Sequence, residues 1–248
     1  MPQNGQTFNG SPRFRSAVVD DGPQFTHFSF YKLDIRWRRL PRDVRETSKE
    51  EARLVLEKFA SRVAIRPYTL TGLRGDADFL LWKIAERVED FQEFAARFLS
   101  TRLGGFLEMP YGYLAMSRRS KYLGGHEHEG GHGATARLEP TGAPYLMVYP
   151  FVKTHEWYQL PFEERRRLMG EHFRIGHKFP SVKIHTTYSY GLDDQEFVLA
   201  FETDAPGDFM ELVEALRFAE QRKYTLRDTP TFACVAAPDF RALLDSLG

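Results

Sequence analysis

Two stretches of this chain repeat the same order of predicted elements, and this repetition constrains the fold more than any other feature. Each stretch reads as strand, helix, strand, helix, strand, with alternating apolar residues in the strands and three- to four-residue spacing in the helices. Phe79 and Phe197 lie 118 residues apart (197 − 79), and Phe91 and Phe209 share that offset (209 − 91). The sequence therefore predicts one module built twice.

The first copy is expected to use strands at 25–37, 78–85 and 111–116, and helices that begin at a capping box at 47–50 and at 88. The second is expected to use strands at 144–154, 195–203 and 231–237, and helices at 161–179 and 207–221. The predicted fold class is α+β, a duplicated ferredoxin-like module whose sheets pair into a dimeric α+β barrel. The predicted parts are a mobile N-terminal arm (1–22), an N-terminal repeat (23–117), a Gly/His-rich linker loop (118–136) and a C-terminal repeat (137–248).

Composition excludes several classes of protein. The 248 residues carry 34 basic and 34 acidic side chains, so a broadly basic nucleic-acid surface is not indicated. The single cysteine, Cys234, leaves no partner for an internal disulfide or a CxxC metal site. The sequence shows neither a signal peptide nor an apolar run that could span a bilayer, and a reducing cytoplasm is the expected location.

The linker loop holds three histidines, His126, His128 and His132. Its glycines and dense charge favour a solvated flexible loop over a metal site, because no nearby carboxylate or cysteine framework fixes a coordination geometry.

One histidine stands on the apolar side of the predicted helix at 161–179. Leu168, His172, Ile175 and Gly176 are spaced by four, three and one, so they share one face. Such a histidine is either a core residue or a ligand. The 118-residue offset matches His172 with Leu54, which indicates that the fold does not need a histidine there. A ligating imidazole needs an acceptor for its second nitrogen, and Glu220 is the candidate.

A tyrosine lies in the preceding apolar strand. Tyr149 matches Tyr31 at the same offset, and it is either a packing residue or an oxidisable phenol beside a cofactor. Lys153, Arg137 and Tyr113 are candidates for binding carboxylate groups of a ligand.

The second copy carries a run of short motifs in a fixed order. They are Tyr149-Pro150 with Lys153, Trp157-Tyr158, Leu160-Pro161, Glu164-Arg165, His172, Gly176 and then TTYSYGLDDQEFVLAFE. In these motifs the chain resembles the chlorite dismutase-like superfamily, particularly its coproheme decarboxylase branch, from about Phe25 to Ala237. The resemblance implies a homopentamer with a haem-type group, iron coproporphyrin or haem b, in the second repeat. It also implies His172 as the iron ligand, Tyr149 as the redox-active tyrosine, Trp157 near the proximal side, and Lys153, Arg137, Tyr113 and Thr231 near propionates.

The resemblance leaves the activity to be decided. Decarboxylases of this family use hydrogen peroxide to convert two propionates of iron coproporphyrin III to vinyl groups, which yields haem b. Chlorite dismutases place an arginine over the iron, and the matching positions here are Ile184 and His185. Adjacent strand residues face opposite sides, and Ile184 is expected to face the iron. Phe151 stands where many decarboxylases carry methionine.

The resemblance therefore implies a coproheme decarboxylase. The alternatives are a chlorite dismutase or weak peroxidase, and a non-enzymatic haem-binding or haem-transfer protein.

Overall fold

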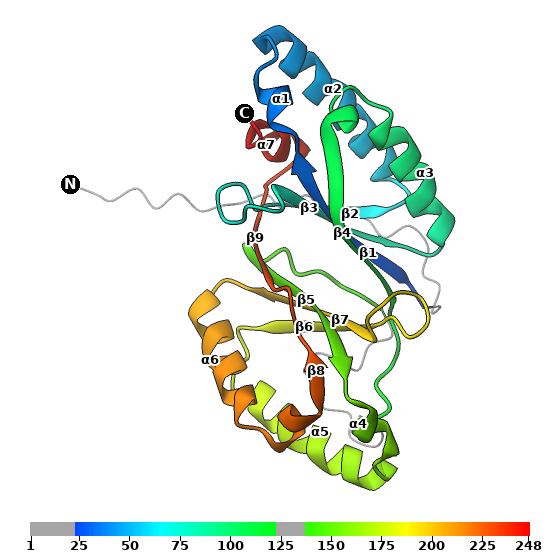
Figure 1. The fold of residues 1–248 in the computed structure, drawn as a ribbon, viewed down its shortest axis with the longest axis vertical. Helices are drawn as coiled ribbons and strands as arrows, with labels where there is room; N and C mark the ends of the chain where they lie inside the picture. Colours follow the sequence, from blue (N-terminus) through cyan, green and yellow to red (C-terminus); the bar gives the residue numbers. More distant parts are fainter. Residues whose placement is uncertain (1–22, 123–136) are drawn as a thin grey trace, which may run out of the picture.

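The computed structural model describes residues 23–122 and 137–248. The predicted arm at 1–22, most of the linker loop and its three histidines lie outside the described residues. Each half of the chain folds as strand, helix, strand, strand, helix, strand, with short additional elements (Figure 1). No helix in the described ranges is long and apolar enough to cross a membrane.

The first half contains four strands and three α-helices. They are β1 (Phe25–Leu33), α1 (Ile35–Arg38), α2 (Arg42–Phe59), β2 (Ala64–Thr69), β3 (Phe79–Ala85), α3 (Val88–Leu99), the 3-10 helix η1 (Gly104–Phe106) and β4 (Leu107–Met116). The predicted capping box is wrong, because α2 begins five residues earlier, after Pro41, and Thr47 lies inside it. Trp37, expected at the end of a strand, lies on α1 and is fully buried.

The second half repeats this order and adds elements at its end. It contains β5 (Tyr145–Lys153), α4 (His155–Gln159), α5 (Phe162–Gly176), β6 (Lys183–Tyr188), β7 (Phe197–Thr203), α6 (Pro206–Arg217), the 3-10 helix η2 (Glu220–Tyr224), β8 (Thr225–Arg227), β9 (Phe232–Ala236) and α7 (Phe240–Asp245). The predicted five-element module lacks β2 in the first half and β6 in the second.

All nine strands belong to one antiparallel sheet in the order β7-β6-β4-β1-β3-β2-β9-β5-β8. Strand β7 pairs with β6 and also with β5, so the sheet closes on itself. Helices α2, α3 and α7 pack at one end of the molecule in Figure 1, and α4, α5 and α6 pack at the other.

The two halves match at an offset that changes along the chain. Strands β1 and β5 and helices α2 and α5 begin 120 residues apart (145 − 25 and 162 − 42), whereas β3 and β7 begin 118 apart (197 − 79). The strand register agrees, since β1 pairs Tyr31 with Phe79 and β5 pairs Phe151 with Phe197. Compared with the first half, the second half has one residue fewer before its second strand, β6, and one residue fewer after it.

This change of offset corrects the predicted equivalences. The counterpart of His172 is Ala52 rather than Leu54, and the counterpart of Tyr149 is Ser29 rather than Tyr31. Ala52 is fully buried in the core, whereas Leu54 is 53% exposed. The inference that the fold does not need a histidine at this position also holds for Ala52, because the first half fills the position with alanine.

The two halves differ in how the space between helices and sheet is filled. In the first half this layer is a continuous core of large side chains, which includes Phe91, Phe94 and Phe98 from α3 and Leu56 and Phe59 from α2. In the second half the corresponding buried cluster has only Met147, Val182, Phe201 and Leu212 at its centre. The second half therefore has room between its helices and the sheet.

Candidate functional site

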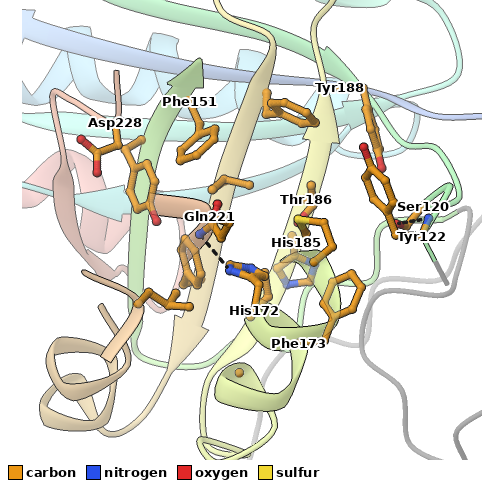
Figure 2. Close-up of a pocket in the computed structure, with 18 of the residues that line it drawn as sticks. Ser120, Tyr122, Phe151, His172, Phe173, His185, Thr186, Tyr188, Gln221 and Asp228 are labelled. Carbon is orange, nitrogen blue, oxygen red and sulfur yellow. Dashed lines mark hydrogen bonds between the residues drawn. The ribbon is translucent and has the colours of Figure 1, made fainter. Parts of the chain in front are cut away.

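That room is a cavity of about 900 Å³, which is within the range typical of small-molecule and cofactor sites. Strands β5, β6 and β7 form one wall, and helices α5 and α6 form the other. Six of the residues predicted for the site line it, namely Arg137, Tyr149, Lys153, Trp157, His172 and Ile184. Figure 2 shows His172 on its helix, with Gln221 pointing toward it.

His172 lies on α5 one turn before Gly176. Burial lowers the pKa of the imidazole to about 4, and the nearby positive charge of Lys153 adds to the effect. The ring is therefore neutral at physiological pH, which is the protonation state that binds a metal ion. A Cβ atom built on Gly176 would lie 3.9 Å from Cδ1 of Ile184, so this end of the cavity is narrow.

The side chain that contacts His172 is Gln221, and the prediction for Glu220 is corrected. Nε2 of Gln221 lies 3.3 Å from Nδ1 of His172, whereas Glu220 accepts a hydrogen bond of 2.6 Å from Arg167 and is 53% exposed. The expected long helix ends at Arg217, and η2 follows with different geometry. This change turns Glu220 outward and Gln221 inward.

Lys153 is the next member of this polar group. Its Nζ donates a hydrogen bond of 2.5 Å to Oε1 of Gln221 and lies 4.3 Å from the centre of the Trp157 ring. The side chain is almost fully buried. Burial and the charge of Arg222 lower the pKa of Lys153 to about 7, although Glu196 opposes the shift. Lys153 therefore titrates close to neutral pH.

Tyr149 lies on β5 on the side that faces the helices. Its ring stacks on Phe201 at a centroid distance of 5.5 Å, and both residues line the cavity. Burial and the negative charge of Asp228 raise the pKa of the phenol above its ordinary value. Tyr149 therefore keeps its proton at physiological pH.

Ile184 and His185 point to opposite sides of β6. Ile184 packs in the layer between helices and sheet, in the same cluster as Tyr149. Nε2 of His185 lies 2.8 Å from Oε2 of Glu202, and its ring meets the buried Trp82 edge to face at 5.3 Å. Of these two side chains, the one that packs in the layer between helices and sheet is therefore apolar. His185 also lines the cavity, as do Lys183 and Thr186 on the same strand.

Two predicted residues lie away from the cavity. Tyr113 is buried among Phe30 and Phe232 in the core on the other side of the sheet. The backbone carbonyl of Thr231 accepts a hydrogen bond of 2.9 Å from Arg74, and Thr231 does not line the cavity. The expectation that these two residues approach a propionate is therefore corrected.

Further polar residues at the cavity were not predicted from the sequence. They include Gln221, Arg165, Thr225, Arg118, Lys183, Arg217, Arg222 and Asp228. Among the described residues, Nε of Arg165 and Oγ1 of Thr225 are buried without a hydrogen-bond partner. Thr225 pairs with Lys153 in the sheet, so one unsatisfied hydroxyl lies beside Lys153. An acceptor-rich group of a ligand, such as a carboxylate, would satisfy these donors.

The donor set also decides what kind of metal group fits. In the described ranges, 23–122 and 137–248, no three His, Cys, Asp or Glu residues come together as a metal site. A single neutral histidine does not form a site for a free ion, but it suffices for an iron held by a macrocycle. A cavity with apolar and aromatic walls, a neutral histidine on α5 and cations in its lining fits a metalloporphyrin with carboxylate arms.

The fold and the cavity together define an α+β protein with a closed antiparallel sheet and a porphyrin-sized site in its second half. The chain belongs to the chlorite dismutase family, whose model matches residues 45–237.

One relative is the coproheme decarboxylase of Mycolicibacterium smegmatis, which is 35% identical over 166 residues, 66% of this chain and 69% of that protein. A solved mutant chlorite dismutase from Candidatus Nitrospira defluvii is 29% identical with a TM-score of 0.83, over 91% of this chain and 96% of the other. A haem-binding protein from Thermus thermophilus, 23% identical with a TM-score of 0.80 over 94% and 100% of the two chains, shares the fold.

Proposed function

We propose that this protein is a coproheme decarboxylase, which uses hydrogen peroxide to convert iron coproporphyrin III to haem b. The observation that carries the proposal is that a neutral, half-buried histidine and a protonated, half-buried tyrosine line the same cavity, together with several cations. The relative from Mycolicibacterium smegmatis carries the name of this activity.

His172 is the proposed iron ligand, through Nε2. Nδ1 must then carry the proton and donate it to an acceptor. Gln221 provides that acceptor once its amide rotates to present Oε1 to His172. The NH2 group of Gln221 then faces Nζ of Lys153. Lys153 can accept a hydrogen bond from this group only as a neutral amine. The pKa of Lys153, lowered to about 7, makes this form accessible.

Tyr149 is the proposed residue that acts on the propionate. In each decarboxylation a propionate –CH2–CH2–COO⁻ loses one hydrogen atom from its β-carbon, one electron and carbon dioxide, and becomes a vinyl group. Hydrogen peroxide takes up the two electrons, the proton of the abstracted hydrogen atom and one further proton from solution, and becomes two water molecules. When bound, the iron porphyrin would react with hydrogen peroxide and so provide the oxidation. The phenoxyl radical of Tyr149 would then take the hydrogen atom from the propionate.

The cations of the cavity are proposed to hold the propionates. Arg137 and Arg165 offer charged donors, and Thr225 offers a hydroxyl. Lys153 adds a charged donor only in its protonated form, in which Gln221 keeps its oxygen toward Lys153. Trp157, held under the Lys153 ammonium, forms part of the proximal wall.

Chlorite dismutase activity is the alternative, because the family model and the solved chlorite dismutase both carry that name. An oxyanion over the iron needs a cation there to stabilise its charge. Ile184 faces the cavity from β6, and β6 contains no arginine, while Lys183 at the start of that strand also lines the cavity. The apolar residue at position 184, where chlorite dismutases are expected to carry arginine, favours decarboxylation.

The test is to incubate the protein with iron coproporphyrin III and hydrogen peroxide and to measure product masses. The expected result is successive loss of two carboxyl groups from the wild type, and a loss of rate of about 10²-fold or more in Tyr149→Phe. Tyr145→Phe is the matched control, because Tyr145 lies on the same strand and face but outside the cavity. Absence of decarboxylation in the wild type, or rapid oxygen release from chlorite, would contradict the proposal.

We further propose that the architecture is a duplicated ferredoxin-like module forming a dimeric α+β barrel, divided as repeats at 23–117 and 137–248. The strand–helix–strand–strand–helix–strand order in each half supports this assignment. A homopentamer in the cytoplasm, with no nucleic-acid partner, remains the proposed assembly and location.

A further inference from the structure

Three charged side chains from separate elements meet at the cavity wall. Arg217 ends α6, Arg222 lies on η2, and Asp228 follows β8. One oxygen of Asp228, Oδ2, accepts hydrogen bonds of 2.6 Å from Nη1 of each arginine. All three residues line the same cavity as Tyr149 and His172, and Figure 2 shows the carboxylate of Asp228 at its edge.

The cluster has more positive than negative charge. Two guanidiniums share one carboxylate, so the cluster carries a net charge of +1. Arg217 and Arg222 keep 45% and 32% of their side chains exposed, while Asp228 keeps 16%. Each guanidinium has five N–H donors, and Asp228 takes one from each arginine. A second carboxylate therefore has both charge and donors to bind here.

The cluster is also close to the proposed reacting phenol. The charges that act on Tyr149 are those of Asp228, Arg217 and Arg222. Although burial favours the neutral acid, Arg222 and Arg217 hold the pKa of Asp228 below its ordinary value. The aspartate is therefore an ionised CH2–COO⁻ group beside Tyr149, and it has the same end group as a propionate.

We propose that Arg217, Arg222 and Asp228 form a carboxylate-exchange site: Asp228 occupies the two arginines in the free protein, and a propionate of the bound porphyrin displaces it. The site places that propionate arm beside the Tyr149 hydroxyl. This inference rests on the proposed function, and it names Asp228 as an internal competitor that opposes substrate carboxylates. When the propionate is lost as carbon dioxide, Asp228 binds both arginines again and favours release of the product.

A carboxylate-exchange role and a purely structural role of Asp228 predict opposite effects of removing Asp228 on ligand binding. If Asp228 only held the arginines in position, its removal would weaken the binding of carboxylated ligands. If it competes with the ligand, its removal strengthens their binding and leaves uncharged porphyrins unaffected. The sign of the effect therefore separates the two roles.

The experiment is spectrophotometric titration of full-length wild type and Asp228→Asn with iron coproporphyrin III and with its tetramethyl ester, which lacks the charges. Asp228→Asn should bind the acid about 3- to 10-fold more tightly and bind the ester unchanged. Arg217→Gln and Arg222→Gln should each weaken binding of the acid but not of the ester. Unchanged or weaker binding of the acid by Asp228→Asn would overturn the exchange site.

Asp208→Asn is the matched control for the change in net charge. Asp208 lies on α6, as Arg217 does, but it bonds Ser181 and does not line the cavity. It should bind both probes like the wild type, and an equal gain in Asp208→Asn would overturn the exchange site. The two proposals fail separately, since a wild type that binds and decarboxylates the acid but gains nothing from Asp228→Asn keeps the proposed function and loses the exchange site.

Discussion

Lys153 and His172 meet the two ends of one side-chain amide, that of Gln221. Nζ of Lys153 donates to Oε1 over 2.5 Å, and Nε2 of the amide lies 3.3 Å from Nδ1 of His172. Because the two neighbours lie at opposite ends of the amide, it presents its oxygen to one of them and its NH2 group to the other in either orientation. The charge of Lys153 and the proton on His172 are therefore coupled.

Gln221→Glu removes this restriction, because a carboxylate accepts from Lys153 and His172 together. A charged acceptor on Nδ1 makes the imidazole a stronger donor to iron. The reduction potential of the bound iron should fall by roughly 40–90 mV, equivalent to about 1–2 kcal/mol for one electron. Spectroelectrochemistry measures the potential, and resonance Raman should show a higher iron–histidine stretching frequency.

Glu220→Gln is the control for this substitution. Glu220 is the neighbouring residue in the chain, but its carboxylate pairs with Arg167 on the surface. The reduction potential of the iron bound to Glu220→Gln should match that of the wild type. A shift in Glu220→Gln with none in Gln221→Glu would restore the assignment made from the sequence.

His172→Ala should remove the five-coordinate histidine–iron spectrum and leave the fold intact. The first half has Ala52 at this helix position, so an alanine is compatible with the architecture. The alanine leaves a space that added imidazole can enter, and about millimolar imidazole should restore the spectrum. Absorption spectra and thermal melting by circular dichroism measure both effects. Survival of the original spectrum without imidazole would show that another residue binds the iron.

The match between Ala52 and His172 also shows which features of the fold could be predicted from the sequence and which could not. The repeated order of elements and the faces of the helices were predictable, because hydrophobic periodicity carries them. The constant 118-residue offset matched the two halves wrongly by two residues over the first strand and helix. The second half is one residue shorter both before and after its second strand, β6, and a single offset cannot include these two changes. The connections on either side of β6 contain no periodic pattern that would reveal them.

Glu220 and Gln221 illustrate a second limit. A continuous helix through residue 221 was the natural interpretation of the apolar spacing. The structure ends α6 at Arg217 and starts η2 at Glu220, which changes the direction of each side chain. Adjacent residues differ widely in direction on any helix, so a small error in phase exchanges the exposed and buried partners. The placing of Tyr113 and Thr231 near propionates came from the family resemblance, and neither residue lines the cavity.

Ile184→Arg should give the cavity a cation over the iron. Ile184 packs in the same cluster as Tyr149 on the side of β6 that faces α5. An arginine there can donate a charge-assisted hydrogen bond to an anion on the iron. Fluoride should bind the iron-loaded variant about tenfold more tightly, as expected for about 1.4 kcal/mol. Fluoride titration by absorption measures this, with Ile184→Met as the uncharged control of similar size. Equal affinities in both variants would show that this position does not overhang the iron.

Lys83→Met should stabilise the protein, and most strongly below neutral pH. Lys83 is fully buried on β3 at the position that Phe201 occupies in the second half, and its Nζ lies 5.0 Å from the centre of the Phe94 ring. Burial lowers the pKa of this lysine from 10.5 to about 7. Between pH 7 and 10.5 the unfolded chain binds a proton that the folded protein does not, so wild-type stability rises with pH across this window.

Methionine has similar length and no charge, so Lys83→Met lacks this dependence. Its gain in unfolding free energy should be on the order of 3 kcal/mol below pH 7 and should shrink as the pH rises toward 10.5. Urea unfolding of both proteins at a series of pH values measures the difference. Lys58→Met is the control, because Lys58 is exposed on α2 and its replacement should give no pH-dependent gain. A Lys83→Met gain that stays constant from pH 7 to 10.5 would contradict the assigned protonation, because the lysine would then be charged in the folded core throughout this range.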